Sequence, residues 1–265
     1  KKYKFGRPWG IPVRYHDFMT LESVSSPDLL EFHLSYKDLD LDPEDFFETE
    51  MHCDLVVHAP ELFASDHILD LVSDDDTYLE QSIKNLQKTI NVTKNLKKWF
   101  PKTSRPLVIV NVGGFTNHGL LSRENRKGLY QKLSDSLERI DQEGVELIPQ
   151  TMPPFPWHFG GQQFHNLFVD PEEIHQFCTR TGYRVCFDVS HSALACNYNG
   201  IAIEECVRLI GPHTAHLHIV DASGIDGEGL QIGEGDLDFS ELAHLLAEYS
   251  PKSSFIPEIW QGHKD

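Results

Sequence analysis

The stretch His216-Leu217-His218-Ile219-Val220-Asp221 predicts a buried strand. Apolar residues alternate with other types in it, and five glycines follow between positions 224 and 235, which is the pattern of a strand that ends in a loop. Alternate side chains of a strand point to the same face, so both histidines occupy a face where a purely structural core would have Val or Leu. The stretch therefore predicts an interior that uses imidazole groups for metal binding or proton transfer.

Similar apolar runs recur along the whole chain. With the run at 214–220 they make eight predicted strands, the others being residues 10–15, 29–35, 54–58, 107–112, 145–150, 183–189 and 255–260. Helical patterns lie between them. Apolar residues three and four positions apart predict helices within 76–100, 129–140, 203–210 and 240–249.

Two further helices are predicted from their start signals. Asp42-Pro43 and Asp170-Pro171 each place an N-cap Asp before a Pro at the first helical position, and Gly182 ends the second helix. Strands and helices that alternate in this way predict one domain over residues 1–265, a parallel (β/α)₈ TIM barrel whose last helix is missing. A doubly wound open sheet is the alternative, but no G-x-G-x-x-G or P-loop follows the first strand. The chain lacks an initiating Met and ends just past a strand, so we expect a domain excised from a longer protein.

The composition argues against several classes of function. A net charge of -18 argues against nucleic-acid binding, and no apolar run approaches the roughly 20 residues of a membrane-spanning helix. We expect no signal peptide, and the five cysteines form no C-x-x-C pair, which is typical of reduced thiols in a cytoplasmic protein. We therefore expect a small-molecule partner and neither nucleic acid nor membrane.

Polar residues cluster at the predicted carboxyl ends of the strands, where the active sites of TIM barrels lie. These residues are Tyr15 to Asp17, Ser35 to Lys37, His58, Asn111, Gln150, Asp188 with His191, His218 with Asp221, and Glu258. Burying an unpaired carboxylate is costly, and no Lys or Arg adjoins Asp188 or Glu258 in the sequence. A divalent metal ion held by Asp188, His218 and Glu258 would satisfy both acids; a metal-free polar network is the alternative.

Five short motifs at these strand ends resemble the xylose isomerase-like TIM barrels, a group of sugar isomerases and epimerases that also includes the endonuclease IV repair enzymes. The motifs are Val57-His58-Ala59-Pro60, Phe187-Asp188-Val189-Ser190-His191, His218-Ile219-Val220-Asp221, Ile232-Gly233-Glu234-Gly235 and Pro257-Glu258. The resemblance spans nearly the whole chain. It implies one divalent ion, Mn, Co, Mg or Zn, held by Asp188, His218 and Glu258, with Gln150 where the family usually has Glu.

The resemblance also implies roles for residues around this site. His191 matches a residue that contacts substrate in the isomerases and metal in the nucleases. His58 matches a nuclease ligand, but Asn111 stands where that branch has His, and Gly227-Glu228-Gly229 replaces its late Asp and His. The three-metal phosphodiesterase site is therefore incomplete.

Gln150 changes the chemistry that we expect. An amide can offer its carbonyl oxygen to a metal ion but cannot accept a proton at neutral pH. A site with Gln150 has one negative charge fewer than a site with Glu. Its affinity for the metal ion should therefore be lower, and the bound ion should be a stronger Lewis acid. The proton must then be moved by Glu258, or by a group such as His58, His16 or Glu228.

Simpler structural roles remain open for several residues. His216 is expected to be a core histidine hydrogen-bonded to a neighbouring strand. For His191, the alternative to a substrate contact is that it simply orients Asp188. Trp157 either stacks on a sugar ring or plugs the barrel mouth, and Lys37 either binds substrate or forms an ordinary ion pair. With His16 and Glu228, these last two complete the set of expected substrate contacts.

The sequence thus predicts a metal-dependent isomerase or epimerase of a sugar or sugar derivative. Surface-polysaccharide or sialic-acid-like sugar biosynthesis is the expected setting, with fusion to or association with other domains of such a pathway. Two alternatives stay open: an endonuclease IV-like phosphodiesterase, and a non-catalytic sugar-binding or regulatory barrel that has lost its base at Gln150.

Overall fold

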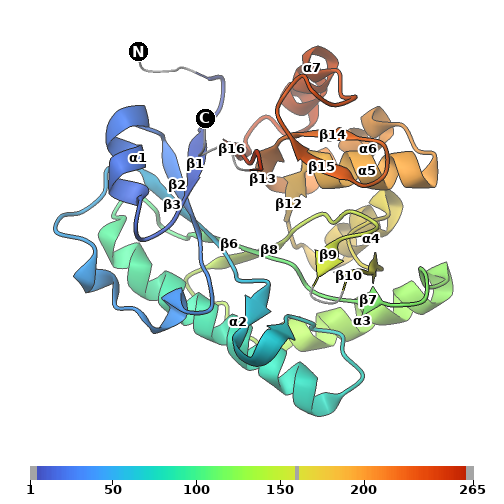
Figure 1. Ribbon diagram of the computed structural model, residues 1–265, viewed down its shortest axis with the longest axis horizontal. Coiled ribbons are helices and arrows are strands. Elements are labelled where there is room, and N and C mark those ends of the chain that lie inside the picture. Colours follow the sequence, from blue (N-terminus) through green and yellow to red (C-terminus); the bar gives the residue numbers. More distant parts are fainter. Residues whose placement is uncertain (1–4, 159–160, 261–265) are drawn as a thin grey trace.

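A computed structural model describes residues 5–158 and 161–260 of the chain (Figure 1). Eight strands pair in parallel around its centre. They are β1 (Gly10–Val13), β2 (Leu29–His33), β3 (Asp54–His58), β6 (Leu107–Val110), β8 (Glu146–Pro149), β12 (Val185–Asp188), β13 (Thr214–Ile219) and β16 (Ser254–Pro257).

The eight strands close into a ring. Five of them form a sheet in the order β1-β2-β3-β6-β8, and the other three form a sheet in the order β12-β13-β16. Single parallel bridges between Gln150 and Cys186 and between Trp9 and Phe255 join the two sheets at both edges. The predicted parallel barrel is therefore confirmed, with all eight strands in the predicted places.

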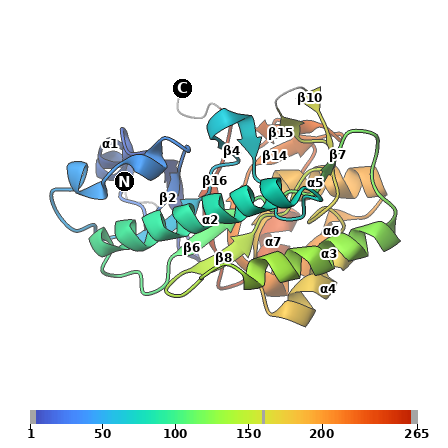
Figure 2. The same cartoon turned by 90° about the horizontal axis from the view of Figure 1, so that it is seen from below.

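Helices cover the outside of the barrel, with α2 and α3 across one side and α4 to α7 on the other (Figures 1 and 2). They are α1 (Phe18–Ser25), α2 (Asp76–Leu96), α3 (Arg123–Glu138), α4 (Pro171–Thr181), α5 (Val189–Asn199), α6 (Ile203–Ile210) and α7 (Phe239–Tyr249). Short 3-10 turns are η1 (Asp38–Asp40), η2 (Pro43–Asp45), η3 (Ala64–Asp66), η4 (Lys97–Trp99) and η5 (Gly211–His213). No helix in the described ranges is both long and apolar enough to cross a membrane.

The prediction of a helix after Asp42-Pro43 is wrong, because only the turn η2 forms there. Asp42 accepts a hydrogen bond from the Glu44 amide as a cap should. Phe46 and Phe47 then both turn inward, their ring centroids 4.6 Å from Tyr15 and 4.5 Å from Phe18. Adjacent residues of a helix point in different directions, so this packing ends the helix after one turn.

The helix expected from Asp170-Pro171 is present as α4. The Asp170 carboxylate accepts hydrogen bonds from the amides of Glu172 and Glu173, and Gly182 ends the helix at a φ of 79°. Helices α1 and α5 were not predicted. The second of these begins directly after β12, where Asp188 caps it by accepting a hydrogen bond from the His191 amide.

The barrel interior changes from apolar to polar along each strand. A buried apolar cluster contains Leu29, Val56, Ile109, Ile148, Cys186, Ala215 and Ile256. Two residues further along several of the same strands, and so on the same face, come the polar side chains Glu31, His58, Gln150, Asp188 and Glu258. The strand period therefore places these polar groups together at the carboxyl ends.

Short antiparallel strands lie in the loops that join the barrel elements. They pair as β4 (Leu62–Phe63) with β5 (His67–Ile68), β7 (Phe115–Thr116) with β11 (Phe164–His165), and β9 (Trp157–His158) with β10 (Gly161–Gln162). The glycine-rich segment forms a further ribbon of β14 (Asp221–Ser223) and β15 (Gly227–Leu230). Asp221 anchors this segment, because its fully buried carboxylate accepts hydrogen bonds from the amides of Ala222, Gly233, Gly235 and Leu237.

Candidate active site

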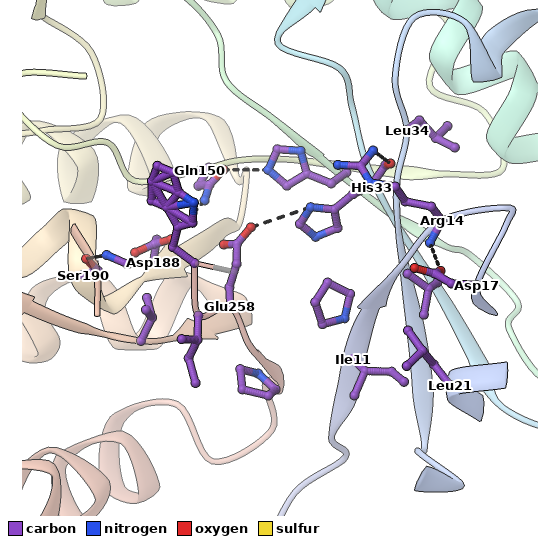
Figure 3. A pocket seen from close by; sticks show the side chains of 18 of the residues that line it. Ile11, Arg14, Asp17, Leu21, His33, Leu34, Gln150, Asp188, Ser190 and Glu258 are labelled. Atoms are coloured by element: carbon purple, nitrogen blue, oxygen red, sulfur yellow. Dashed lines mark hydrogen bonds and ion pairs between the residues drawn. The ribbon is translucent and has the colours of Figure 1, made fainter. Parts of the chain in front are cut away.

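A cavity of about 860 Å³ opens at the carboxyl ends of the barrel strands. Gln150, Asp188 and Glu258 face one another on one side of it, and His33 reaches in from the other (Figure 3). The volume lies in the range of small-molecule sites, about 300–1,000 Å³. The cavity therefore lies where a TIM barrel enzyme holds its substrate.

Asp188, His218 and Glu258 form a cluster beside this cavity. One ligand atom of each lies within 4.8 Å of the others. His218 Nδ1 is 2.6 Å from Glu258 Oε2 and 3.5 Å from Asp188 Oδ2. His218 and Asp188 are buried, whereas the Glu258 side chain keeps 30% of its surface exposed. The structure thus brings together the three residues predicted to hold a metal ion.

Gln150 lies against the same cluster. Its Nε2 is 3.2 Å from Asp188 Oδ2 and 3.1 Å from His218 Nδ1, and its Oε1 is 2.9 Å from His58 Nε2. His58 Nδ1 donates to the Ala59 carbonyl over 2.9 Å. The two ends of an amide are assigned from their hydrogen bonds, so a half-turn of this amide turns Oε1 toward Asp188 and lets Nε2 donate to His58. The chain can therefore offer Gln150 Oε1 as a fourth ligand.

A second buried cluster, which the sequence analysis missed, lies behind His218. The fully buried Glu31 contacts three imidazoles: its carboxylate lies 2.8 Å from His33 Nε2, 2.8 Å from His216 Nε2 and 3.0 Å from His218 Nε2. The predicted hydrogen bond of His216 to a neighbouring strand is present, because its Nδ1 lies 2.7 Å from Ser254 Oγ on β16. The signal for Glu31 and His33 was their two-residue spacing on β2, which repeats that of His216 and His218.

The electrostatics of the two clusters favour charged groups. Burial alone would raise the pKa of Glu258, but His218 and then His33 outweigh it and hold this pKa at about 2. The pKa of Glu31 is also held well below its usual value by His218 and the other imidazoles, against the effect of burial. Burial would lower the pKa of His218, but the surrounding acids raise it well above its ordinary value. Both acids are therefore held in their ionised form next to His218.

His191 and Glu228 line the cavity next to this cluster. His191 Nδ1 lies 2.9 Å from the Thr151 carbonyl oxygen and 3.5 Å from Asp188 Oδ2, and its Nε2 lies 3.7 Å from Glu228 Oε2. Burial lowers the pKa of His191, but Asp188 and Glu228 raise it by more. Burial also raises the pKa of Glu228. The pair therefore has the means to exchange a proton with a bound molecule.

Two other predicted substrate contacts, His16 and Lys37, are not part of this centre. His16 is at the cavity wall, with 75% of its side chain exposed and its Nε2 3.6 Å from Asp17. Lys37 is exposed and is not among the residues lining the cavity; its Nζ lies 5.9 Å from the centroid of the Tyr36 ring. Trp157 belongs to β9, but its side chain lies outside the described part of the structure.

Asn111 occupies the position where the nuclease branch was expected to have a ligand. Its side chain is buried, and its Nδ2 donates to the carboxylate of Glu61 at the cavity wall. Asn111 therefore holds the Glu61 carboxylate at the cavity wall through its amide nitrogen.

Comparison with solved structures shows the same fold in several other proteins. A D-tagatose 3-epimerase-like protein superimposes with a TM-score of 0.65 and 21% identity, covering 95% of this chain and 90% of that one. A D-allulose 3-epimerase from Methylomonas sp. gives a TM-score of 0.63 with 13% identity, covering 97% of this chain and 85% of that one. A family 2 AP endonuclease from Brucella melitensis gives a TM-score of 0.62 with 11% identity, covering 95% of this chain and 93% of that one.

Sequence comparisons give one partial relative and one family. The uncharacterized protein MJ1311 of Methanocaldococcus jannaschii is 29% identical over 122 residues, which are 45% of this chain and only 38% of that protein. A family model described as a xylose isomerase-like TIM barrel matches residues 26–265. With the closed parallel barrel and the polar cluster at its carboxyl ends, this match shows that the chain belongs to the xylose isomerase-like TIM barrel family.

Proposed function

We propose that this protein is a divalent-metal-dependent isomerase or epimerase that acts on a sugar or sugar derivative. The observation that carries the proposal is the cluster of Asp188, His218 and Glu258 beside a cavity of about 860 Å³. The fold shared with a D-allulose 3-epimerase and with a D-tagatose 3-epimerase-like protein supports the same class of reaction.

The donor set suits a hard or borderline divalent ion. Two carboxylates, one imidazole nitrogen and the amide oxygen of Gln150 are the ligands that Mn, Co, Mg or Zn accept in proteins. When bound, such an ion would polarise a carbonyl or hydroxyl oxygen of the sugar. Asp188, His218 and Glu258 would hold it, with Gln150 after its amide has turned.

The chain's own residues supply binding and proton transfer. Glu258 is partly exposed to the cavity and is ionised, so it can take a proton from a sugar carbon. Gln150 cannot be the second base. His191 and Glu228, 3.7 Å apart and next to Asp188, are the groups of the cavity that can hold sugar hydroxyls and return the proton.

The cavity favours an uncharged sugar over a phosphorylated one. Among the described residues that line it, Arg14 is the single Arg or Lys, whereas five are Asp or Glu. Arg14 is already engaged, since its Nη1 donates to the His33 carbonyl over 2.7 Å. Phosphate groups need clustered basic side chains or backbone amides, so the same observation speaks against a phosphodiesterase.

The test is proton exchange on sugars in D₂O. Mn-loaded protein is incubated with a panel of ketohexoses and aldoses, and NMR follows both the new epimer or isomer and deuterium incorporated beside the carbonyl. We expect incorporation with the wild type and a loss of at least about 100-fold for Glu258→Gln, because the base and one metal ligand are removed together. Glu234→Gln is the control, since Glu234 is exposed in the glycine-rich segment. Metal-loaded wild-type protein that exchanges no proton on any sugar would contradict the proposal.

A further inference from the structure

We propose that Glu31 is a positioning residue that fixes the proton on Nε2 of His218 and so presents Nδ1 of that ring to the metal ion. The inference rests on the metal site of the proposed function but not on the identity of the sugar.

Glu31 is a buried acid whose partners are imidazoles. It is fully buried on β2, and among the described residues its ion-pair partners are His33, His216 and His218. A buried carboxylate without donors is very costly, and the rings of His33 and His218 lie within hydrogen-bond distance of it through Nε2. All three rings meet Glu31 through Nε2.

This arrangement decides which nitrogen of His218 is free. His218 Nε2 lies 3.0 Å from Glu31 Oε1 and 3.3 Å from Oε2, while Nδ1 lies on the other side of the ring, 2.6 Å from Glu258 Oε2. If a metal ion takes the place of the Nδ1 proton while Glu31 keeps the proton on Nε2, the lone pair of Nδ1 is directed toward the point where Asp188 and Glu258 converge. A carboxylate that accepts the second N–H of a ligating histidine orients the ring and makes its other nitrogen a better donor.

Neighbouring residues hold Glu31 in place from behind. His216 Nε2 lies 2.8 Å from Glu31 Oε2, and Ser254 Oγ, 2.7 Å from His216 Nδ1, can donate to that nitrogen. When Ser254 donates to Nδ1, the proton of the His216 ring lies on Nε2, the nitrogen that faces Glu31. The chain of contacts therefore runs from Ser254 through His216 and Glu31 to His218, and only its last member faces the metal site.

Glu31 also restores a charge that Gln150 removes. With Gln150 in place of a carboxylate, the ion, Asp188 and Glu258 sum to zero. The anionic Glu31, one imidazole away, adds a negative charge to this buried region without occupying a coordination position. Metal binding should therefore depend on Glu31 more strongly than its distance from the ion would suggest.

The experiment measures metal affinity and the proton position separately. In calorimetric titration with Mn²⁺, we expect Glu31→Gln to bind roughly 10- to 100-fold more weakly than wild type, the usual effect of removing such a partner. Glu241→Gln is the matched control, because it removes the same charge at an exposed position of α7, and its affinity should stay within about twofold of wild type. Equal affinities of Glu31→Gln and wild type would overturn the inference.

A second measurement needs no variant and would stand even if Glu31→Gln failed to fold. In ¹⁵N-histidine-labelled wild-type protein loaded with Zn²⁺, two-bond ¹H–¹⁵N spectra should show His218 protonated on Nε2 and coordinated through Nδ1. Coordination through Nε2, or no metal uptake by the wild type, would overturn the inference. Metal binding as expected without any sugar exchange would contradict only the proposed function.

Discussion

Gln150 contacts two members of the buried polar cluster, Asp188 and His218. Its amide lies within 3.2 Å of Asp188 and 3.1 Å of His218, so a carboxylate at this position would face the same groups. Without a metal ion, a third acid beside Asp188 and Glu258 is repelled by both. With a metal ion, it adds a charged ligand.

Gln150→Glu should therefore make the protein more dependent on metal. We expect a lower Tm without metal, a larger rise in Tm on adding Mn²⁺, and Mn²⁺ binding at least about 10-fold tighter than in wild type. Differential scanning calorimetry and titration calorimetry measure these effects. Gln231→Glu, which adds the same charge at an exposed position, should change none of them. Unchanged affinity in Gln150→Glu would place Gln150 outside the ligand set.

The sequence predicted part of this centre residue by residue. Asp188, His218 and Glu258 were predicted because each follows an apolar run at a strand end. Glu31 was missed because it lies inside an apolar run whose end was placed at Ser35 to Lys37, whereas β2 ends at His33. That shift also explains why Lys37, beyond the strand, does not line the cavity. Which nitrogen of a ring meets which acid depends on contacts across the barrel, which a strand pattern does not contain.

The helices were predictable where periodicity and caps agreed. Helix α4 has its Asp cap, its Pro and its final Gly, and it formed as predicted. The turn η2 has the same Asp-Pro start, but aromatic packing of Phe46 and Phe47 stopped it. Helix α5 was not predicted because its N-cap residue, Asp188, was interpreted only as a site residue.

Two glycines in these helices should respond oppositely to substitution by Ala. Gly182 ends α4 at a φ of 79°, where a side chain is strained, so Gly182→Ala should lower the free energy of unfolding by about 1–2 kcal/mol. Gly128 is exposed within α3 with open space around its Cβ position, so Gly128→Ala should raise it by about 0.5–1 kcal/mol. Urea unfolding of both variants checks the pair, and shifts of the same sign would contradict these helix assignments.

The barrel as a whole was the most predictable feature. Eight apolar runs in alternation with helical segments were enough, because a parallel strand of this fold is buried on both faces and reads as an apolar run. The ring is closed by two single bridges, at Gln150 and at Trp9. Neither bridge could be predicted from the local sequence pattern.

The closed barrel also shields the thiols of the chain. All five cysteines are buried and free, and burial raises the pKa of Cys53, Cys178 and Cys186 to about 12. Thiols with such pKa values stay protonated and unreactive at pH 8. A disulfide reagent such as Ellman's should therefore label none in the native protein and five after denaturation. Fast labelling of a native thiol would show that part of the barrel opens.

Metal content tests the central claim most directly. The wild type and the Asp188→Asn variant are purified without chelators, reconstituted with Mn²⁺ and freed of excess ion. The metal content of each is then measured by mass spectrometry and divided by the protein concentration. The cluster of Asp188, His218 and Glu258 predicts one divalent ion per wild-type chain and a large loss of that ion in the variant. Three ions per chain would indicate a nuclease-type centre. No ion in the wild type, or an unchanged ion in Asp188→Asn, would contradict the metal site itself.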